Sequence, residues 1–141
     1  MRSDFYTFYL YFKNAKILEK ELAELFSSYG LSFSEFGTLE ALKAFKKSSV
    51  QMVAKRILIT SGTITHTINS LLKKGLITRQ MSAKDNRVFC LLLTQKGTEL
   101  IDELMMKHDE VTSKFFEPLS GQERVDLFSL LKKIYKNKEK K

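Results

Sequence analysis

The chain has 141 residues, enough for one domain with a single hydrophobic core, and 43% of them are apolar. Its formal net charge of +8 and pI near 9.5 favour an anionic partner, such as nucleic acid or an anionic membrane surface. The single cysteine, Cys90, excludes an intramolecular disulfide, and the N-terminal residues have neither a cleavage site nor an apolar run long enough for a signal or membrane helix. We therefore expect a cytoplasmic protein.

Residues 4–29 follow one long helical pattern, which Gly30 ends in the position that a C-cap favours. This helix begins with FYTFYLYF at residues 5–12, where six of eight residues are aromatic. The three phenylalanines can share one face, which leaves the tyrosines on other sides. Aromatic residues on several sides predict burial on two sides, and a homodimer would supply the second.

Two shorter helices are expected next. Ser34 can cap the first, which carries Phe36, Leu39, Leu42 and Phe45 as its apolar residues. Polar KKSS separates it from a short helix in VQMVAKRIL, whose inward residues would be Val50, Val53, Ala54 and Ile57. A further helix then begins at Thr60 or Ser61 and stops at Gly75.

This further helix has two contrasting faces in SGTITHTINSLLKKGLITR, residues 61–79. One stripe is apolar and contains Ile64, Ile68, Leu71 and Leu72. The opposite face has no acid and contains Gly62, Thr63, His66, Asn69, Ser70 and Lys73. Such a face suits close approach to DNA, since hydroxyls can bind phosphates or base edges and an asparagine can pair with adenine. The alternative is a polar surface helix that binds nothing.

After Gly75 the pattern changes from helix to strand. LITRQM and RVFCLLL are rich in strand formers, and the SAKDN between them is typical of a turn, so a two-stranded hairpin is expected. Thr94 then begins a long helix that Pro118 ends, and its apolar face would contain Leu100, Ile101, Leu104, Met105, His108, Val111 and Phe115. Ser120 and Glu123 form a capping box for the last helix, with Leu127, Leu130, Leu131 and Ile134.

The predicted order is mainly α with a small β-hairpin wing, which is the arrangement of a winged helix-turn-helix. In that motif the second helix enters the major groove of DNA and the hairpin loop reaches the backbone or minor groove. We expect one domain over 1–141, with a DNA-binding lobe at about 34–94 between helices at about 4–30 and 95–137.

The core from Val50 to Gly97 resembles the MarR family of bacterial transcriptional regulators. The matching elements are VQ..A..I, then SGTIT with a spaced leucine, GLI.R, a D.R wing and the LT..G that opens the next helix. Their presence in register over about 48 residues makes the resemblance specific. It implies a homodimer that forms through the helices at about 4–30 and 95–137 and binds an inverted-repeat operator. Such a regulator is usually a repressor released by a small molecule or by thiol oxidation.

The resemblance also implies which residues bind DNA. The helix from Ser61 would read the major groove, and Arg87, held by Asp85, would enter the minor groove, where a narrow, electronegative site suits arginine. Arg79 and Lys84 would add phosphate contacts. The implied residues are Ser61, Gly62, Thr63, Thr65, His66, Asn69, Ser70, Lys73, Arg79, Lys84, Asp85 and Arg87. A surface ion pair in a turn is the alternative for Asp85 and Arg87.

The effector would bind between the dimerisation region and the DNA-binding lobe, as the resemblance implies. Tyr9, Phe12 and Phe36 are the candidates, because aromatic rings with hydroxyls suit a flat phenol or quinone-like compound. Core packing is the alternative for these aromatics. A second hypothesis is redox sensing through Cys90, although its strand setting in VFCLLL is typical of a packing residue, away from the start of the first helix where thiol-sensing members carry the reactive cysteine.

Other classes of function have little support in the sequence. His66, His108 and Cys90 lack the spacing of metal ligands, and we expect no cofactor. We also find no nucleophile with a base, no paired carboxylates and no phosphate-binding glycine loop, so an enzyme is not expected. A membrane-surface protein that uses the lysine-rich C-terminal tail is the remaining rival.

Overall fold

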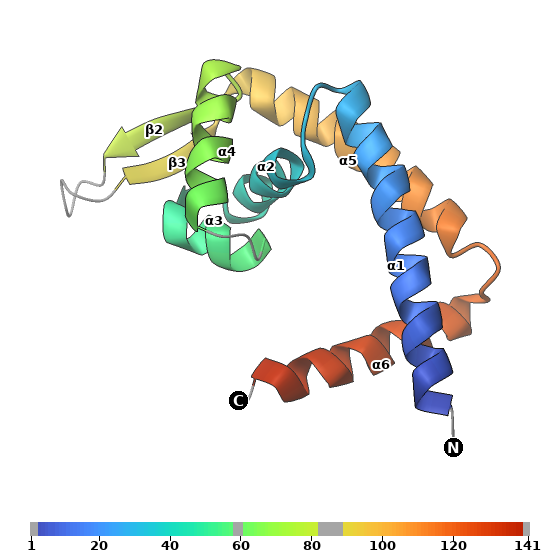
Figure 1. The fold of residues 1–141 in the computed structure, drawn as a ribbon. Coiled ribbons are helices and arrows are strands. Elements are labelled where there is room, and N and C mark those ends of the chain that lie inside the picture. Colours follow the sequence, from blue (N-terminus) through green and yellow to red (C-terminus); the bar gives the residue numbers. More distant parts are fainter. Residues whose placement is uncertain (1–2, 58–60, 82–88, 140–141) are drawn as a thin grey trace. The chain divides into compact units, whose positions relative to one another are not determined.

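The computed structural model describes residues 3–57, 61–81 and 89–139. These residues form six α-helices and three short β-strands, in the order shown in Figure 1. The chain divides into two compact units, residues 1–108 and residues 109–141, and each unit is described by itself. The predicted winged-helix order is confirmed, whereas the single domain stays a prediction. In the described ranges, no helix has the length and apolar content needed to cross a membrane.

Helix α1 (Ser3–Ser28) ends where the sequence predicts. Gly30 adopts a φ of +73°, a left-handed conformation that glycine takes without strain, and the N–H of Leu31 donates to the carbonyl of Phe26 at 3.0 Å. The helix buries only Leu22 and Phe26, near its C-terminal end. All residues from 3 to 17 are exposed, and these include the six aromatics.

Helix α2 (Phe33–Phe45) is the centre of the first unit, since it contacts α1, α3, α4 and β3. Its N-cap is Ser32, and the prediction of Ser34 is wrong. The Ser32 Oγ accepts from the Glu35 N–H at 3.1 Å, while Glu35 Oε1 accepts from the Ser32 N–H at 3.0 Å. This capping box needs a glutamate three residues after the cap, which only Ser32 has.

The predicted apolar face of α2 is buried except at its last residue. Leu39 and Leu42 have no exposed surface, but Phe45 is 41% exposed. The Arg56 guanidinium of the next helix lies 5.1 Å from the centre of the Phe45 ring. Phe45 therefore packs against a cation at the surface and does not belong to the core.

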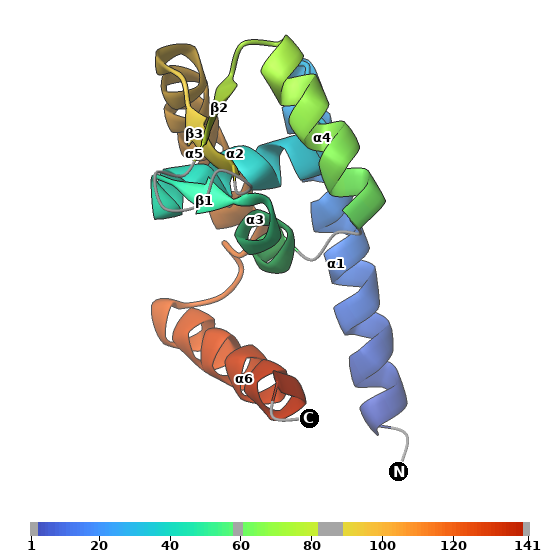
Figure 2. The ribbon, with the colours of Figure 1, turned by 90° about the vertical axis from the view of Figure 1, so that its left-hand side faces the viewer.

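The hairpin is part of a three-stranded antiparallel sheet with the strand order β1–β3–β2 (Figure 2). Strands β2 (Ile77–Met81) and β3 (Phe89–Leu93) are the two predicted strands. The sequence analysis missed β1 (Ser48–Ser49), which pairs with Leu91 and Cys90 of β3. Two consecutive serines carry no strand signal, so this pairing depends on the apolar strand beside them.

Helices α3 (Val50–Ile57) and α4 (Ser61–Lys73) form the helix pair of the motif. Val53 is the one fully buried residue among the predicted inward residues of α3; the others are half-buried. In α4 the apolar stripe is confirmed, because Ile64, Ile68 and Leu71 are buried and Leu72 is half-buried. The capping prediction at Thr60 or Ser61 falls on residues outside the described structure or without described side chains.

Helix α5 (Gln95–Phe115) begins against the start of β2. The helix begins after Thr94, close to the predicted start, and Thr94 caps it: the Thr94 Oγ1 accepts from the Gly97 N–H at 3.0 Å and donates to the Gly75 carbonyl at 2.7 Å. The Thr94 N–H donates to the Leu76 carbonyl at 3.0 Å. A Cβ at Gly97 would lie 2.0 Å from that same carbonyl oxygen, so only glycine fits here.

The second unit contains the last turns of α5 and helix α6 (Gly121–Glu139). The predicted capping box is confirmed: the Glu123 N–H donates to Ser120 Oγ at 3.2 Å, and the Ser120 N–H donates to Glu123 Oε1 at 2.9 Å. Helix α6 buries no residue. Its Leu127 is half-buried, and its other apolar side chains, including Phe128 at 65% and Ile134 at 61%, are exposed.

Candidate nucleic-acid interface

The outward face of α4 is polar, uncharged for most of its length and exposed. It contains Thr63, Thr65, His66, Asn69 and Lys73, all of which are exposed. The buried stripe on the opposite side of the same helix fixes this orientation, because α4 packs on α2. The structure thus brings five of the predicted DNA-binding residues to one helical face. The side chains of Ser61 and Gly62 are not among those described.

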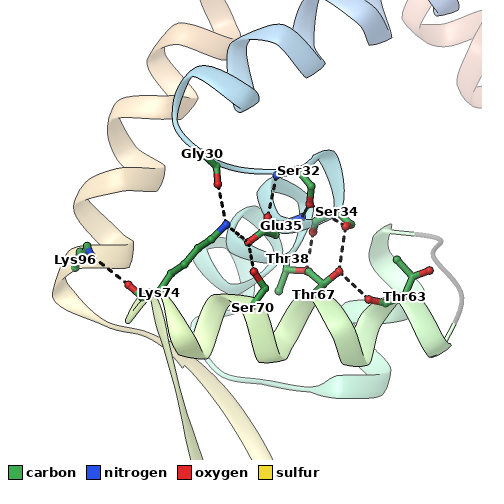
Figure 3. A network of polar contacts seen from close by, with 10 residues as sticks. All are labelled: Gly30, Ser32, Ser34, Glu35, Thr38, Thr63, Thr67, Ser70, Lys74 and Lys96. Atoms are coloured by element: carbon green, nitrogen blue, oxygen red, sulfur yellow. Dashed lines mark hydrogen bonds and ion pairs between the residues drawn. The ribbon is translucent and has the colours of Figure 1, made fainter.

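Ser70 departs from the predicted position on this face. It is half-buried, and its Oγ donates to Glu35 Oε2 at 3.0 Å. The side chain therefore points toward α2 and joins a network of polar contacts beneath α4 (Figure 3). The prediction of a groove-facing Ser70 hydroxyl is wrong in this geometry.

The sequence analysis missed the acid of this network, Glu35. Its carboxylate also accepts from Lys74 Nζ at 2.7 Å, and Lys74 donates to the Gly30 carbonyl at 2.8 Å (Figure 3). Burial raises the pKa of Glu35, but hydrogen bonds from Lys74, the Ser32 N–H and Ser70, with the charge of Lys74, outweigh it, so the pKa lies below its usual value. Glu35 is therefore a charged group at neutral pH.

Arg79 lies beside this interface on strand β2. It is exposed, and its guanidinium lies 5.6 Å from the centre of the Phe89 ring on β3. Contact with the ring restricts the orientation of the guanidinium while leaving its charge in solvent. The predicted wing residues Lys84, Asp85 and Arg87 lie outside the described residues.

A groove of about 800 Å³ lies between α1, the N-terminal half of α2 and the end of α3. Apolar side chains form most of its wall, among them Leu18, Leu22 and Phe36. Ser32 and Ser34 supply hydroxyls at one side. Ser34 Oγ also lies 3.1 Å from Thr67 Oγ1 of α4, so one wall of the groove is hydrogen-bonded to the helix with the exposed polar face (Figure 3).

The predicted effector residues do not come together in one protomer. Phe36 lines the groove and stacks on Phe26, with 4.1 Å between ring centres. Phe12 and Phe26 are 14 residues apart (26 − 12) on α1, which is about 21 Å along the helix axis. Tyr9 and Phe12 are exposed and do not line the groove, so their assignment to a common site with Phe36 is corrected.

Cys90 is half-buried in the central strand of the sheet, opposite Ser49 and Gln80. This is the packing position that its sequence setting indicates. Across the residues that the structure describes, no group of three or more His, Cys, Asp or Glu side chains is placed to hold a metal ion.

Comparison with known proteins identifies the class of regulator. Residues 20–104 match the family model described as transcriptional regulator SarA/Rot. The chain is 33% identical over 105 residues to the uncharacterized HTH-type transcriptional regulator YkoM of Bacillus subtilis, covering 74% of this chain and 68% of YkoM.

Two solved structures show the same fold. Sco3205, a MarR family regulator from Streptomyces coelicolor in complex with DNA, superposes with a TM-score of 0.89 at 20% identity, over 97% of this chain and 88% of that one. BpsR of Bordetella bronchiseptica, whose DNA binding is regulated by 6-hydroxynicotinic acid, has a TM-score of 0.82 at 24% identity, over 90% and 91%.

Regulators of this kind are not enzymes, in agreement with the prediction. The matched family model covers more than half of the chain and includes the helix pair and the hairpin strands. The chain therefore belongs to the SarA/Rot family of DNA-binding transcriptional regulators, and its winged-helix fold is that of MarR family regulators.

Proposed function

We propose that this protein is a cytoplasmic homodimeric repressor that reads an inverted-repeat operator with α4 and leaves it when a small aromatic effector binds. The observation that carries the proposal is the exposed, acid-free face of α4, held outward by the buried stripe beneath it. Hydroxyls and an amide on such a face can reach base edges in the major groove, and Lys73 and Arg79 can neutralise phosphates.

Exposed apolar side chains support the homodimer. The aromatic residues among 5–12 of α1 and most apolar residues of α6 are about half exposed or more, which a protein seldom tolerates over long helices in solution. A second copy would bury these surfaces, and two copies would present two α4 helices to half-sites about one DNA turn apart. Light scattering at micromolar concentration tests this point, and a monomer there would contradict it.

The DNA-binding experiment separates base reading from phosphate binding. Operator duplexes are selected from a randomised pool, and binding is measured from about 50 to 200 mM salt. Asn69→Ala should lose about 1–3 kcal/mol on the selected duplex and little on a scrambled one. Lys73→Ala should weaken binding to both duplexes and reduce the salt slope by about one.

A matched control uses Lys43→Ala on α2. This substitution removes the same charge at an exposed ion pair with Asp102, away from the proposed interface. If Lys43→Ala and Lys73→Ala have equal effects, the assignment of α4 as the reading helix is wrong. Arg87→Ala tests the proposed wing contact in the same assay, with an expected loss of about 1–3 kcal/mol.

The groove supports a non-covalent effector. Its apolar wall suits an aromatic ring, and the Ser32 and Ser34 hydroxyls can hydrogen-bond a phenol or carbonyl oxygen. An effector that takes the Ser34 hydroxyl would compete with the Ser34–Thr67 hydrogen bond and so bias the position of α4.

Hydroquinone, salicylate and 6-hydroxynicotinic acid are suitable probes. A compound at 100 times its dissociation constant should stabilise the protein by about 2.7 kcal/mol and release the selected duplex. Phe36→Ala should abolish this response. Cys90→Ser should keep it, because the proposed trigger is not covalent; a Cys90→Ser protein that binds DNA but no longer responds would instead support thiol sensing.

A further inference from the structure

Glu35 is an acid buried between two helices of the DNA-binding lobe, with only 7% of its surface exposed. Its Oε1 accepts the Ser32 N–H at 3.0 Å, within the capping box of α2. Its Oε2 accepts from Ser70 Oγ of α4 at 3.0 Å and from Nζ of Lys74, the residue directly after α4, at 2.7 Å (Figure 3). One carboxylate thus ties the start of α2 to the C-terminal half of α4.

The contacts lie along one side of α4. Thr67 bonds to Ser34, and Ser70 and Lys74 bond to Glu35, so the three positions follow the spacing of a single helical face. Each bond is directional, unlike the apolar packing of Ile64 and Ile68 beside it. Together they restrict rotation of α4 about its axis and sliding along it.

We propose that Glu35 determines the DNA sequence specificity of this regulator by holding α4 in its reading position and by keeping the charge of Lys74 away from phosphates. The inference rests on the proposed role of α4 as the reading helix. Base edges are read only when the side chains are held in register, whereas phosphate contacts carry no sequence information. Lys74 has 38% of its side chain exposed, so it can turn toward solvent once its partner is neutral.

The two roles give opposite effects on two kinds of DNA. Loss of the Glu35 charge should weaken binding to the operator, because α4 is held less firmly. The same loss should strengthen binding to unrelated DNA, because a released lysine adds one phosphate contact. A residue that only stabilises the fold would weaken both, so the direction on unrelated DNA is the informative readout.

The test substitutes Glu35→Gln in the full chain. Binding is measured to the duplex selected by the parent protein and to a scrambled duplex of equal length and composition. The specificity ratio is the affinity for the selected duplex divided by the affinity for the scrambled one, and we expect it to fall about tenfold or more. We also expect the slope of log affinity against log salt concentration on the scrambled duplex to steepen by up to about one. Glu103→Gln is the matched control, since it makes the same charge change on α5, where Glu103 Oε1 accepts a 3.4 Å hydrogen bond from the Tyr29 hydroxyl.

Two further variants separate the roles. Glu35→Gln combined with Lys74→Gln should lose the gain on scrambled DNA but keep the low specificity ratio. Ser70→Ala removes one bond to α4 without releasing Lys74, so it should lower the ratio and leave binding to scrambled DNA unchanged. Ser70→Ala also keeps the proposal testable if Glu35→Gln does not fold.

Three outcomes would overturn the inference: an unchanged ratio in both Glu35→Gln and Ser70→Ala, an equal loss on both duplexes in Glu35→Gln, or a gain on scrambled DNA that Glu103→Gln reproduces. Asn69→Ala distinguishes this failure from that of the proposed function. If Asn69→Ala lowers the ratio and the Glu35 and Ser70 variants do not, α4 reads DNA without help from Glu35.

Discussion

Replacing Gly97 with alanine tests the close approach of α5 to the backbone of Leu76. The added Cβ would lie 2.0 Å from the Leu76 carbonyl oxygen, whereas ordinary contacts begin at 3.4 Å. The first turn of α5 must therefore move by about 1.4 Å (3.4 − 2.0) away from the start of β2. The Thr94 N–H bonds to this same oxygen at 3.0 Å, so the movement also breaks that hydrogen bond.

Three contributions determine how much Gly97→Ala should change the free energy of unfolding. Overpacking against backbone costs about 3 kcal/mol, and the lost hydrogen bond costs about 1 kcal/mol. Alanine in place of glycine in a helix returns about 1 kcal/mol. Gly97→Ala should therefore lower the free energy of unfolding by about 3 kcal/mol.

Urea denaturation followed by circular dichroism measures this change, at one protein concentration for all variants because association would add to stability. Gly121→Ala is the control, since a Cβ there meets nothing within 4 Å, and it should be neutral or slightly stabilising. A Gly97→Ala protein as stable as the parent would show that the close approach between α5 and Leu76 is absent.

Three other predictions concern stability. Thr94→Val removes the hydroxyl that caps α5 and binds the Gly75 carbonyl, and it should cost about 1–2 kcal/mol in the same urea assay. Ser120→Ala removes half of the α6 capping box and should destabilise this helix by about 1 kcal/mol. Thermal unfolding of the second unit, followed by the loss of its helical circular dichroism, measures this change. The pKa of Glu35 is lower in the folded chain than its reference value of 4.5. The contribution of this carboxylate to the free energy of unfolding is therefore complete above pH 4.5 and is lost as the pH falls through the folded pKa. The difference in unfolding free energy between the parent and Glu35→Gln should therefore be constant near neutral pH and shrink below about pH 4.5, and a difference that grows on acidification would contradict this sign.

Local patterns predicted most of the fold. Three features depend only on residues within a few positions of one another, so they can be read directly from the sequence. They are the apolar stripe of α4, the start of α5 near Thr94 and the capping box of Ser120 and Glu123. The cap of α2 is also local: Ser32 has a glutamate three residues later, whereas the predicted cap Ser34 has Gly37 there. The position of Gly97 was visible in the LT..G motif, whereas its cause, the nearby Leu76 carbonyl, was not.

The features that were missed depend on contacts between distant residues. Glu35 bonds to residues 35 and 39 positions away, and no helical or strand period links them. Strand β1 exists because β3 supplies a partner. Phe36 of α2 was expected beside Tyr9 and Phe12 of α1. The structure shows that it stacks instead on Phe26, which lies near the other end of α1.

The sheet has a consequence for how the protein avoids aggregation. Strand β3, the apolar FCLLL segment, has β1 on one side and β2 on the other, so its backbone groups are shielded from other chains. In the described part of the chain, β2 has a ladder partner on one side only. Of its exposed residues, Thr78, Arg79 and Gln80 are polar and Met81 is apolar. A charged residue within an edge strand opposes the addition of strands from other molecules. Strand pairing between copies through β2 is thereby disfavoured, which is consistent with the proposed dimer through the helices.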